Sequence, residues 1–323
     1  MRGLRGTRGM RGMADAGGGV YVASTYNIAR AATYLDTPTY CFGAVGVDEA
    51  LHPSVVYRAA GWNGKKYWMA MTPYPDLDAT WENPSILCSA DGTTWTVPAG
   101  LTNPLDEVGG PDHNADPELF WDATYTKLYC FWNYWDNPNY TVFRMESTDG
   151  ATWTNKQAAL TGAGYIFVTP AILHDGTNYR MYVVDITTNP NGLKYRTCST
   201  LDGTWSAPVT CTVNGIPALR DMWHMSVYKN LAGAYTMLLT TCTVNVSGVA
   251  GRLGVATSAD GITWTFQGET LLPSVAGWDN SNIYRASAVQ TGALTWDVWY
   301  SAYSTGVSPN QAPHIARTTM TVT

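Results

Sequence analysis

The sequence predicts an all-β protein, a five-bladed β-propeller, from three observations. First, a motif of the form S-x-D-G-x-T-W occurs as SADGTTW, STDGATW and SADGITW, with a looser copy, STLDGTW. Second, the tryptophans that end these copies recur every 50 to 60 residues, about the length of a four-stranded blade. Third, each repeat unit opens with two runs of alternating β-branched and aromatic residues around a polar turn, which is the pattern of a β-hairpin.

Each copy of the motif is expected to form a tight turn. Asp-Gly between two β-rich runs is a hairpin signal, because glycine adopts positive φ at no steric cost. The serine and aspartate side chains can cap the amides of the turn. The tryptophan then lies just inside the following strand, where it can pack against the neighbouring blade.

Five segments mark the beginnings of the blades: HPSVVYRAAGWNGKKYWMAMT, ADPELFWDATYTKLYCFWNY, VTPAILHDGTNYRMYVVDI, WHMSVYKNLAGAYTMLLTT and YRASAVQTGALTWDVWYSAY. The fifth unit runs to Thr323 with a third strand, HIARTTMTV, but no fourth. We expect Thr39–Val47 to supply this missing outer strand. Closing the ring in this way removes an exposed sheet edge.

The first 19 residues, MRGLRGTRGMRGMADAGGG, carry glycine at every third position from Gly3 to Gly12. Only glycine fits at the axis of a collagen triple helix, so residues 1–19 are interpreted as the end of a collagen-like stalk and predict a homotrimer. A flexible basic leader is the alternative interpretation. Residues 20–38 are expected to be a connector with a short helix near Ile28–Leu35, and residues 39–323 to form the propeller.

Composition narrows the classes of partner. The 323-residue chain has a formal net charge of −6, and the leader contributes four arginines, so the rest is more acidic still. Such a surface repels phosphate backbones, which argues against nucleic-acid binding. No apolar run is long enough for a membrane span, and the leader lacks the apolar stretch of a secretory signal. Only 14% of residues are charged, whereas 14 Trp and 20 Tyr are present, a balance that suits sugar binding.

A candidate site follows from the propeller topology, because the first and third strands of every blade begin on one face of the ring. The first strands place there His52, Asp116 with Glu118, Thr169, His224 and Arg285. The third strands place there Glu82, Asn83 and His314, while Asp112, His113, Trp135, Trp223 and Tyr284 lie close by in the sequence. No H-x-H or similar ligand spacing occurs, so neither a metal site nor a cofactor is predicted.

The blade starts HPSVVY, ADPELFW, WHMSVYK and IYRASAV, together with ENPSI and the DG-x-x-W hairpins, resemble five-bladed propeller proteins of phage and bacteria over about residues 45–323. These look similar to the arabinanase, xylosidase and invertase glycosidases. The resemblance implies an aspartate base or nucleophile, a glutamic acid donor and a second aspartate that tunes the donor. Asp116 matches one aspartate, but His52 stands where the base is expected, and Glu82 and Glu118 are substitutes for the donor by proximity only.

Three functions follow. The favoured one is a virion-associated, phage-tail receptor-binding protein, whose stalk joins other tail or fibre proteins and whose propeller recognises host cell-surface polysaccharide. Three heads would strengthen weak sugar binding through effective concentration. The alternative is a glycoside hydrolase or depolymerase in which Asp116 acts with Glu82 or Glu118. The third is a structural propeller with no ligand in its channel.

Overall fold

The structure, a computed structural model, describes residues 24–40, 48–108, 112–136, 139–163, 167–246, 248–304 and 312–323. These residues form strands and two short 3-10 helices, η1 (Pro75–Leu77) and η2 (Ala79–Trp81), and contain no α-helix. Within the same ranges, no helix is long and apolar enough to cross a membrane. The predicted collagen-like leader, residues 1–19, lies outside the described residues.

The strands form successive antiparallel meanders, each starting with its innermost strand. The first contains β2 (Ala50–Trp62), β3 (Lys65–Pro73) and β4 (Ser85–Ser89), and the second β5 (His113–Asp122), β6 (Lys127–Asp136), β7 (Asn139–Ser147) and β8 (Thr154–Ala163). Next come β9 (Phe167–His174), β10 (Tyr179–Asp185), β11 (Gly192–Cys198) and β12 (Val209–Asn214), then β13 (Arg220–Lys229), β14 (Tyr235–Thr243), β15 (Arg252–Ser258) and β16 (Thr263–Leu271). These eight strands form one sheet, because β12 pairs with β16 in parallel. The last meander contains β17 (Asn282–Gly292), β18 (Thr295–Tyr303) and β19 (Pro313–Val322).

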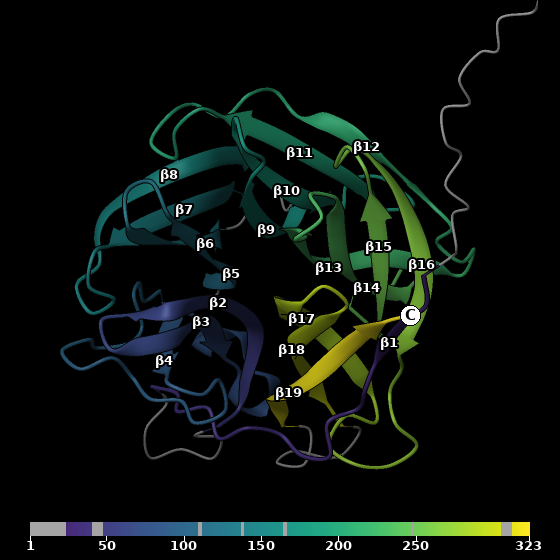
Figure 1. The fold of residues 1–323 in the computed structure, drawn as a ribbon, viewed down its shortest axis with the longest axis horizontal. Coiled ribbons are helices and arrows are strands. Elements are labelled where there is room, and N and C mark those ends of the chain that lie inside the picture. Colours follow the sequence, from purple (N-terminus) through teal and green to yellow (C-terminus); the bar gives the residue numbers. More distant parts are fainter. Residues whose placement is uncertain are drawn as a thin grey trace, which may run out of the picture.

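The meanders surround a common centre (Figure 1). The innermost strands contact one another in the order β2, β5, β9, β13 and β17, and β17 returns to β2. The described chain is therefore an all-β protein whose sheets are arranged as in a propeller.

An N-terminal strand does close the last sheet, but it is not the predicted one. β1 (Tyr26–Ile28) pairs antiparallel with β19, placing Tyr26 opposite Val322 and Ile28 opposite Met320. Of the predicted closing segment Thr39–Val47, residues 41–47 lie outside the described residues, and Thr39 and Tyr40 are not in a strand.

The predicted helix near Ile28–Leu35 is wrong, because Ile28 ends β1 and residues 29–40 are not helical. The amides of Ala29 and Leu35 donate to the carbonyls of Thr319 and Ile315, so this segment uses its backbone hydrogen bonds along β19 rather than within itself.

The turns of the repeated motif form as expected. The Ser89 hydroxyl accepts the Gly92 amide at 2.8 Å, and Asp91 Oδ1 accepts the amides of Thr93 and Thr94 at 2.8 Å each. Gly92 has a φ of 76°, which is the left-handed region that favours glycine. The copies at Asp149 and Asp260 repeat these contacts.

The tryptophans of the motif pack against the preceding meander, as the sequence predicted. Trp264 lies edge-on to Tyr182, with ring centroids 6.0 Å apart, and Trp95 lies edge-on to Trp299 at 6.5 Å. The glycine of the turn is part of the same contact, since a Cβ on Gly150 would lie 2.2 Å from the Trp68 ring. The core is thus a set of aromatic clusters between neighbouring sheets.

Candidate active site

An irregularity recurs near the start of every innermost strand and positions the candidate residues. In β2, His52 and Pro53 together face one residue of β3, which is a β-bulge. The same arrangement occurs at Asp116–Pro117 in β5, Thr169–Pro170 in β9 and Trp223–His224 in β13, and β17 has one extra residue at Tyr284. His52, Asp116 and Thr169 have left-handed φ values of 57°, 55° and 56°, a strained state that commonly marks functional sites.

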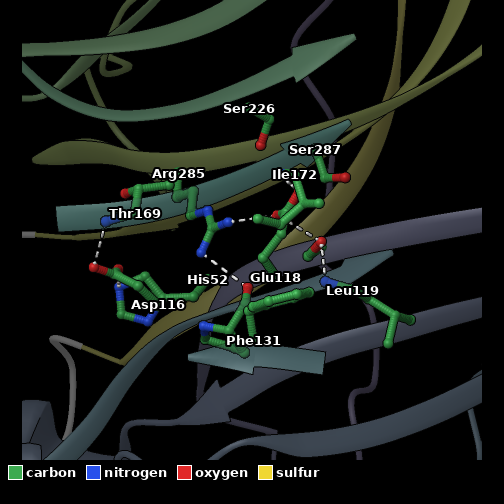
Figure 2. Close-up of polar contacts among 12 residues, drawn as sticks. His52, Asp116, Glu118, Leu119, Phe131, Thr169, Ile172, Ser226, Arg285 and Ser287 are labelled. Carbon is green, nitrogen blue, oxygen red and sulfur yellow. Dashed lines mark hydrogen bonds and ion pairs between the residues drawn. The ribbon is translucent and has the colours of Figure 1, made fainter. Parts of the chain in front are cut away.

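The bulges bring together His52, Asp116 and His224, which come from three different meanders. His52 Nε2 lies 3.2 Å from Asp116 Oδ1, and His224 Nδ1 lies 3.4 Å from the same oxygen. All three side chains are buried, with about 2% of each exposed. Figure 2 shows His52 beside Asp116, and Thr169 above them donating its amide to the carboxylate. We call these three residues the central cluster.

Each member of the central cluster also contacts a residue outside the cluster, and this contact fixes its orientation. His52 Nδ1 lies 2.8 Å from the Thr72 hydroxyl, and His224 Nδ1 lies 2.5 Å from the Thr169 hydroxyl. Asp116 Oδ2 accepts from Asn133 Nδ2 at 3.1 Å and from the Thr169 amide at 3.0 Å. Each ring and the carboxylate are therefore oriented by a buried partner, as side chains around bound metals are.

Burial sets the charges of the central cluster. Burial lowers the pKa of His52 well below its ordinary value and that of His224 to about 4, although Asp116 opposes both shifts. Burial would raise the pKa of Asp116, but His224, His52 and Arg285 hold it at about 2. Near neutral pH the cluster therefore consists of two neutral imidazoles around one carboxylate.

This arrangement fits a divalent cation. Ligand-type atoms of the three residues lie within 4.8 Å of one another. Among the described residues, His52 Nε2 and Asp116 Oδ1 have no hydrogen-bond partner although both are buried. Two atoms bound to one cation at about 2.1 Å each stand roughly 3.0 to 3.4 Å apart, which matches the 3.2 Å between them. Neutral imidazole and carboxylate are also common ligands of divalent transition metals.

Glu82 and Tyr284 lie beside the central cluster. Glu82 Oε1 is 3.6 Å from His52 Nδ1, and burial, with Asp116 nearby, raises the pKa of this carboxyl well above its ordinary value. The Tyr284 ring lies 4.6 Å from that of His224 and 5.3 Å from that of His52, centroid to centroid. Trp223 packs edge-on to His224 at 5.3 Å. Beside the cluster the site thus has a carboxyl with a raised pKa and an aromatic side.

Glu118 and Arg285 lie deeper in the channel than the central cluster. Arg285 donates to Glu118 Oε2 at 2.9 Å and to the Pro117 carbonyl at 3.0 Å, and Glu118 Oε2 also accepts from the Ser54 hydroxyl at 2.9 Å. Burial raises the pKa of Glu118 to about 7, while Arg285 opposes the shift. Figure 2 shows this ion pair crossing between β17 and β5. Glu118 is therefore the ion-pair partner of Arg285.

The structure places the other candidate residues around the site rather than in it. Asn83 holds a loop, since it accepts from the Asn114 side chain at 3.0 Å and donates to the Tyr40 hydroxyl at 2.8 Å. His314 stacks on Tyr34 at 3.6 Å. The remaining three form a rim on β5 and β6: His113 packs against Trp135 at 5.2 Å, and Asp112 hydrogen-bonds Tyr134.

Sequence reasoning did not bring His52, Asp116 and His224 together as a group that fits a cation, and it missed their partners Thr72 and Asn133. The ligands come one at a time from separate meanders, so no local spacing relates them. One signal was available: His52, Asp116 and Thr169 each precede a proline at the start of an innermost strand.

No family model matches the chain. The A type blood N-acetyl-alpha-D-galactosamine deacetylase of Flavonifractor plautii is 28% identical over an alignment of 332 positions that covers 84% of this chain and 42% of that protein. The chain thus spans less than half the length of this curated relative. The structure of an N-acetylgalactosamine deacetylase from F. plautii, in complex with blood group B trisaccharide, aligns with a TM-score of 0.81 at 22% identity and covers 91% of this chain and 95% of that one.

Glycosidase structures align less closely. The alpha-L-arabinofuranosidase of Podospora anserina gives a TM-score of 0.61 at 15% identity, over 90% of this chain and 95% of that one. The endo-arabinase of Bacteroides thetaiotaomicron gives a TM-score of 0.58 at 13% identity, over 88% of this chain and 96% of that one. The chain therefore has the β-propeller fold of arabinanase-type glycosidases and of a sugar deacetylase, and its relatives are carbohydrate-active enzymes.

Proposed function

We propose that the chain is a carbohydrate-active hydrolase that removes the acetyl group from an N-acetylated hexosamine. The observation that carries this proposal is the buried central cluster, in which two imidazoles and one carboxylate lie close enough together to share a divalent cation. The similarity to a galactosamine deacetylase over 84% of the chain supports the choice of reaction. The two imidazoles, neutral near pH 7, and the Asp116 carboxylate would hold the cation.

A cation held there would supply Lewis-acid polarisation of the acetamide carbonyl. Glu82 is the residue placed to move protons: its raised pKa suits a group that accepts a proton from water and then donates one to the departing amine. The C–N bond breaks, acetate leaves with the water oxygen, and the amine remains on the sugar. The half-buried Tyr284 would provide the aromatic surface beside which the sugar ring lies.

We also assign five blades to the ring. The eight-stranded sheet then consists of two blades, β9–β12 and β13–β16, because each half is a complete four-stranded meander with its own innermost strand. β1 then serves as the outer strand of the last blade.

The test is acetate release from a GalNAc-terminated oligosaccharide by the full chain, after chelation and after re-addition of Mn²⁺ or Zn²⁺. Chelation should abolish release and one of the metals should restore it. Asp116→Asn and His224→Ala should lower the rate at least 100-fold, whereas His174→Ala, an exposed histidine outside the cluster, should not. Release that is indifferent to chelation and to Asp116→Asn would contradict the proposal.

A glycoside hydrolase is the second candidate, and one observation favours it. The pKa values of Asp116 and Glu82 are pushed in opposite directions, as in acid–base pairs of carboxylates. The same reaction mixture separates the two: new reducing ends without acetate indicate glycosidase activity. If neither product forms although the oligosaccharide binds, the receptor-binding head on a trimeric stalk becomes the working proposal, and light scattering of the full chain tests it.

A further inference from the structure

We infer that the opposite mouth of the channel is a second ligand site, which binds one uncharged pyranose unit of a carbohydrate. A cavity of about 440 Å³, here called the far cavity, lies among the later parts of the innermost strands. Its volume is within the range of small-molecule sites.

The far cavity and the central cluster lie at different ends of the same strands. The cluster occupies positions 52, 116 and 224, whereas the cavity is lined by residues two or more positions later, up to Tyr57 in β2, Asp122 in β5 and Gln290 in β17. Because a strand rises about 3.3 Å per residue, this offset in sequence is also an offset along the channel. The Glu118–Arg285 ion pair with Ser54 lies between the two, so a ligand in one place does not contact the other.

The inner end of the far cavity offers hydrogen-bonding groups with unused capacity. Among the described residues, Glu118 Oε1 accepts one hydrogen bond, from the Ile172 amide at 3.4 Å, which is near the limit of a hydrogen bond. The Ser287 hydroxyl oxygen accepts the Val55 amide at 2.9 Å and the Tyr228 hydroxyl at 3.3 Å, so its proton is free to be donated. Figure 2 shows Glu118, Ile172 and Ser287 near one another.

The wall of the far cavity offers aromatic surface. Phe120 and Tyr228 both line it and are half-buried, so part of each ring is open. Trp121 also lines it, but the Arg58 guanidinium lies 4.3 Å over its ring. Phe120, Tyr228 and the likewise half-buried Tyr57 are therefore the rings that a ligand can contact.

Together, these features of the far cavity indicate the chemical class of its ligand. Glu118 is paired with Arg285, so the inner end carries little net charge and does not attract an ion. A wholly apolar ligand would cover Glu118 Oε1, which has only the long contact with the Ile172 amide, and would leave the Ser287 hydroxyl proton without an acceptor, which is unfavourable. A pyranose has hydroxyl groups for these two atoms and a C–H face for the rings of Phe120 and Tyr228. An uncharged sugar satisfies all of them.

The experiment titrates the full chain, in a His224→Ala background that disables the central cluster, with methyl α-D-galactopyranoside, methyl α-D-glucopyranoside and lactose, and follows binding by calorimetry and by saturation-transfer NMR. At least one of the three should bind. Phe120→Ala should weaken this binding at least tenfold, and Ser287→Ala should weaken it several-fold. Tyr125→Ala is the matched control, because Tyr125 is 55% exposed and lies outside the cavity.

If Phe120→Ala does not fold, Phe120→Leu replaces it, since it keeps apolar volume and removes the ring. Absence of binding for all three sugars overturns the inference, and so does binding that Phe120→Leu leaves unchanged. Acetate release by the wild-type chain is measured separately, so failure here and failure of the proposed deacetylation are distinguished.

Discussion

At the residue scale, each aspartate of the repeated motif stabilises the turn in which it lies. Asp91, Asp149 and Asp260 each accept two backbone amides in the turn. These bonds hold the glycine that follows in its left-handed conformation, against an aromatic ring of the preceding meander. One short side chain thus links a turn to the packing between sheets.

Asp149→Ala should lower the free energy of unfolding by about 1 kcal/mol, because two amides lose their acceptor. Urea denaturation followed by tryptophan fluorescence measures this. Asp36→Ala, at an exposed aspartate outside the motif, serves as the control and should change stability by less than about 0.5 kcal/mol. Equal effects of the two substitutions would show that the turn contacts contribute nothing.

Asp149 also leads to a prediction about the pH dependence of stability. The amides of Thr152 and Ala151 lower the pKa of Asp149 in the folded state, below the value of about 3.9 expected in the unfolded chain. Its stabilising contribution is therefore complete above that value and is lost as the pH falls. The stability difference between wild type and Asp149→Ala should shrink as the pH is lowered from about 5 to about 2. A constant difference over this range would contradict the assignment.

At the element scale, the bulges explain why strand starts carry the site. An extra residue turns the local backbone so that its side chain points differently from the regular alternation of the strand. Three of the bulges have proline as their second residue, Pro53, Pro117 and Pro170, and all three prolines are buried. Because proline has no N–H, the irregular backbone leaves no unpaired donor at these positions.

Pro170→Ala should therefore destabilise the protein by about 2 kcal/mol, from a buried, unpaired amide and from a more flexible unfolded chain. Pro208→Ala is a matched comparison, because Pro208 is exposed and shares only the second effect. The two variants are compared by thermal and urea unfolding. The explanation fails if Pro208→Ala is as destabilising as Pro170→Ala.

At the scale of the whole molecule, the ring depends on a contact between the two ends of the described chain. Ile28 is 3% exposed, pairs with Met320 and packs in the cluster of the last sheet. Its contact covers an edge strand that would otherwise present unpaired backbone groups.

Ile28→Ala should cost about 3 kcal/mol of stability and increase hydrogen exchange along β19, since the cavity loosens β1. Leu294→Ala, at a leucine 57% exposed, should cost far less. Exchange measured by mass spectrometry resolves the two ends of the chain. Unchanged protection of β19 in Ile28→Ala would show that β1 does not maintain the closure.

Local features of this fold were predictable from the sequence and distant ones were not. The turns at Asp91, Asp149 and Asp260 and the packing of their tryptophans follow from a motif seven residues long. By contrast, the pairing of Tyr26 with Val322 joins opposite ends of the chain, and nothing local distinguishes residues 26–28 from residues 39–47 as the closing strand. The central cluster likewise joins three meanders, so its geometry had to come from the bulges and not from spacing.

The ion pair between Glu118 and Arg285 has a consequence for how a glycan would be handled. It blocks the channel beneath the central cluster, so a saccharide chain has no passage through the ring and enters and leaves by a single opening. Only the tip of a branch reaches the buried carboxylate under this constraint. For the proposed deacetylation, this predicts action on the terminal sugars of a chain, with the interior units of a long polymer left untouched.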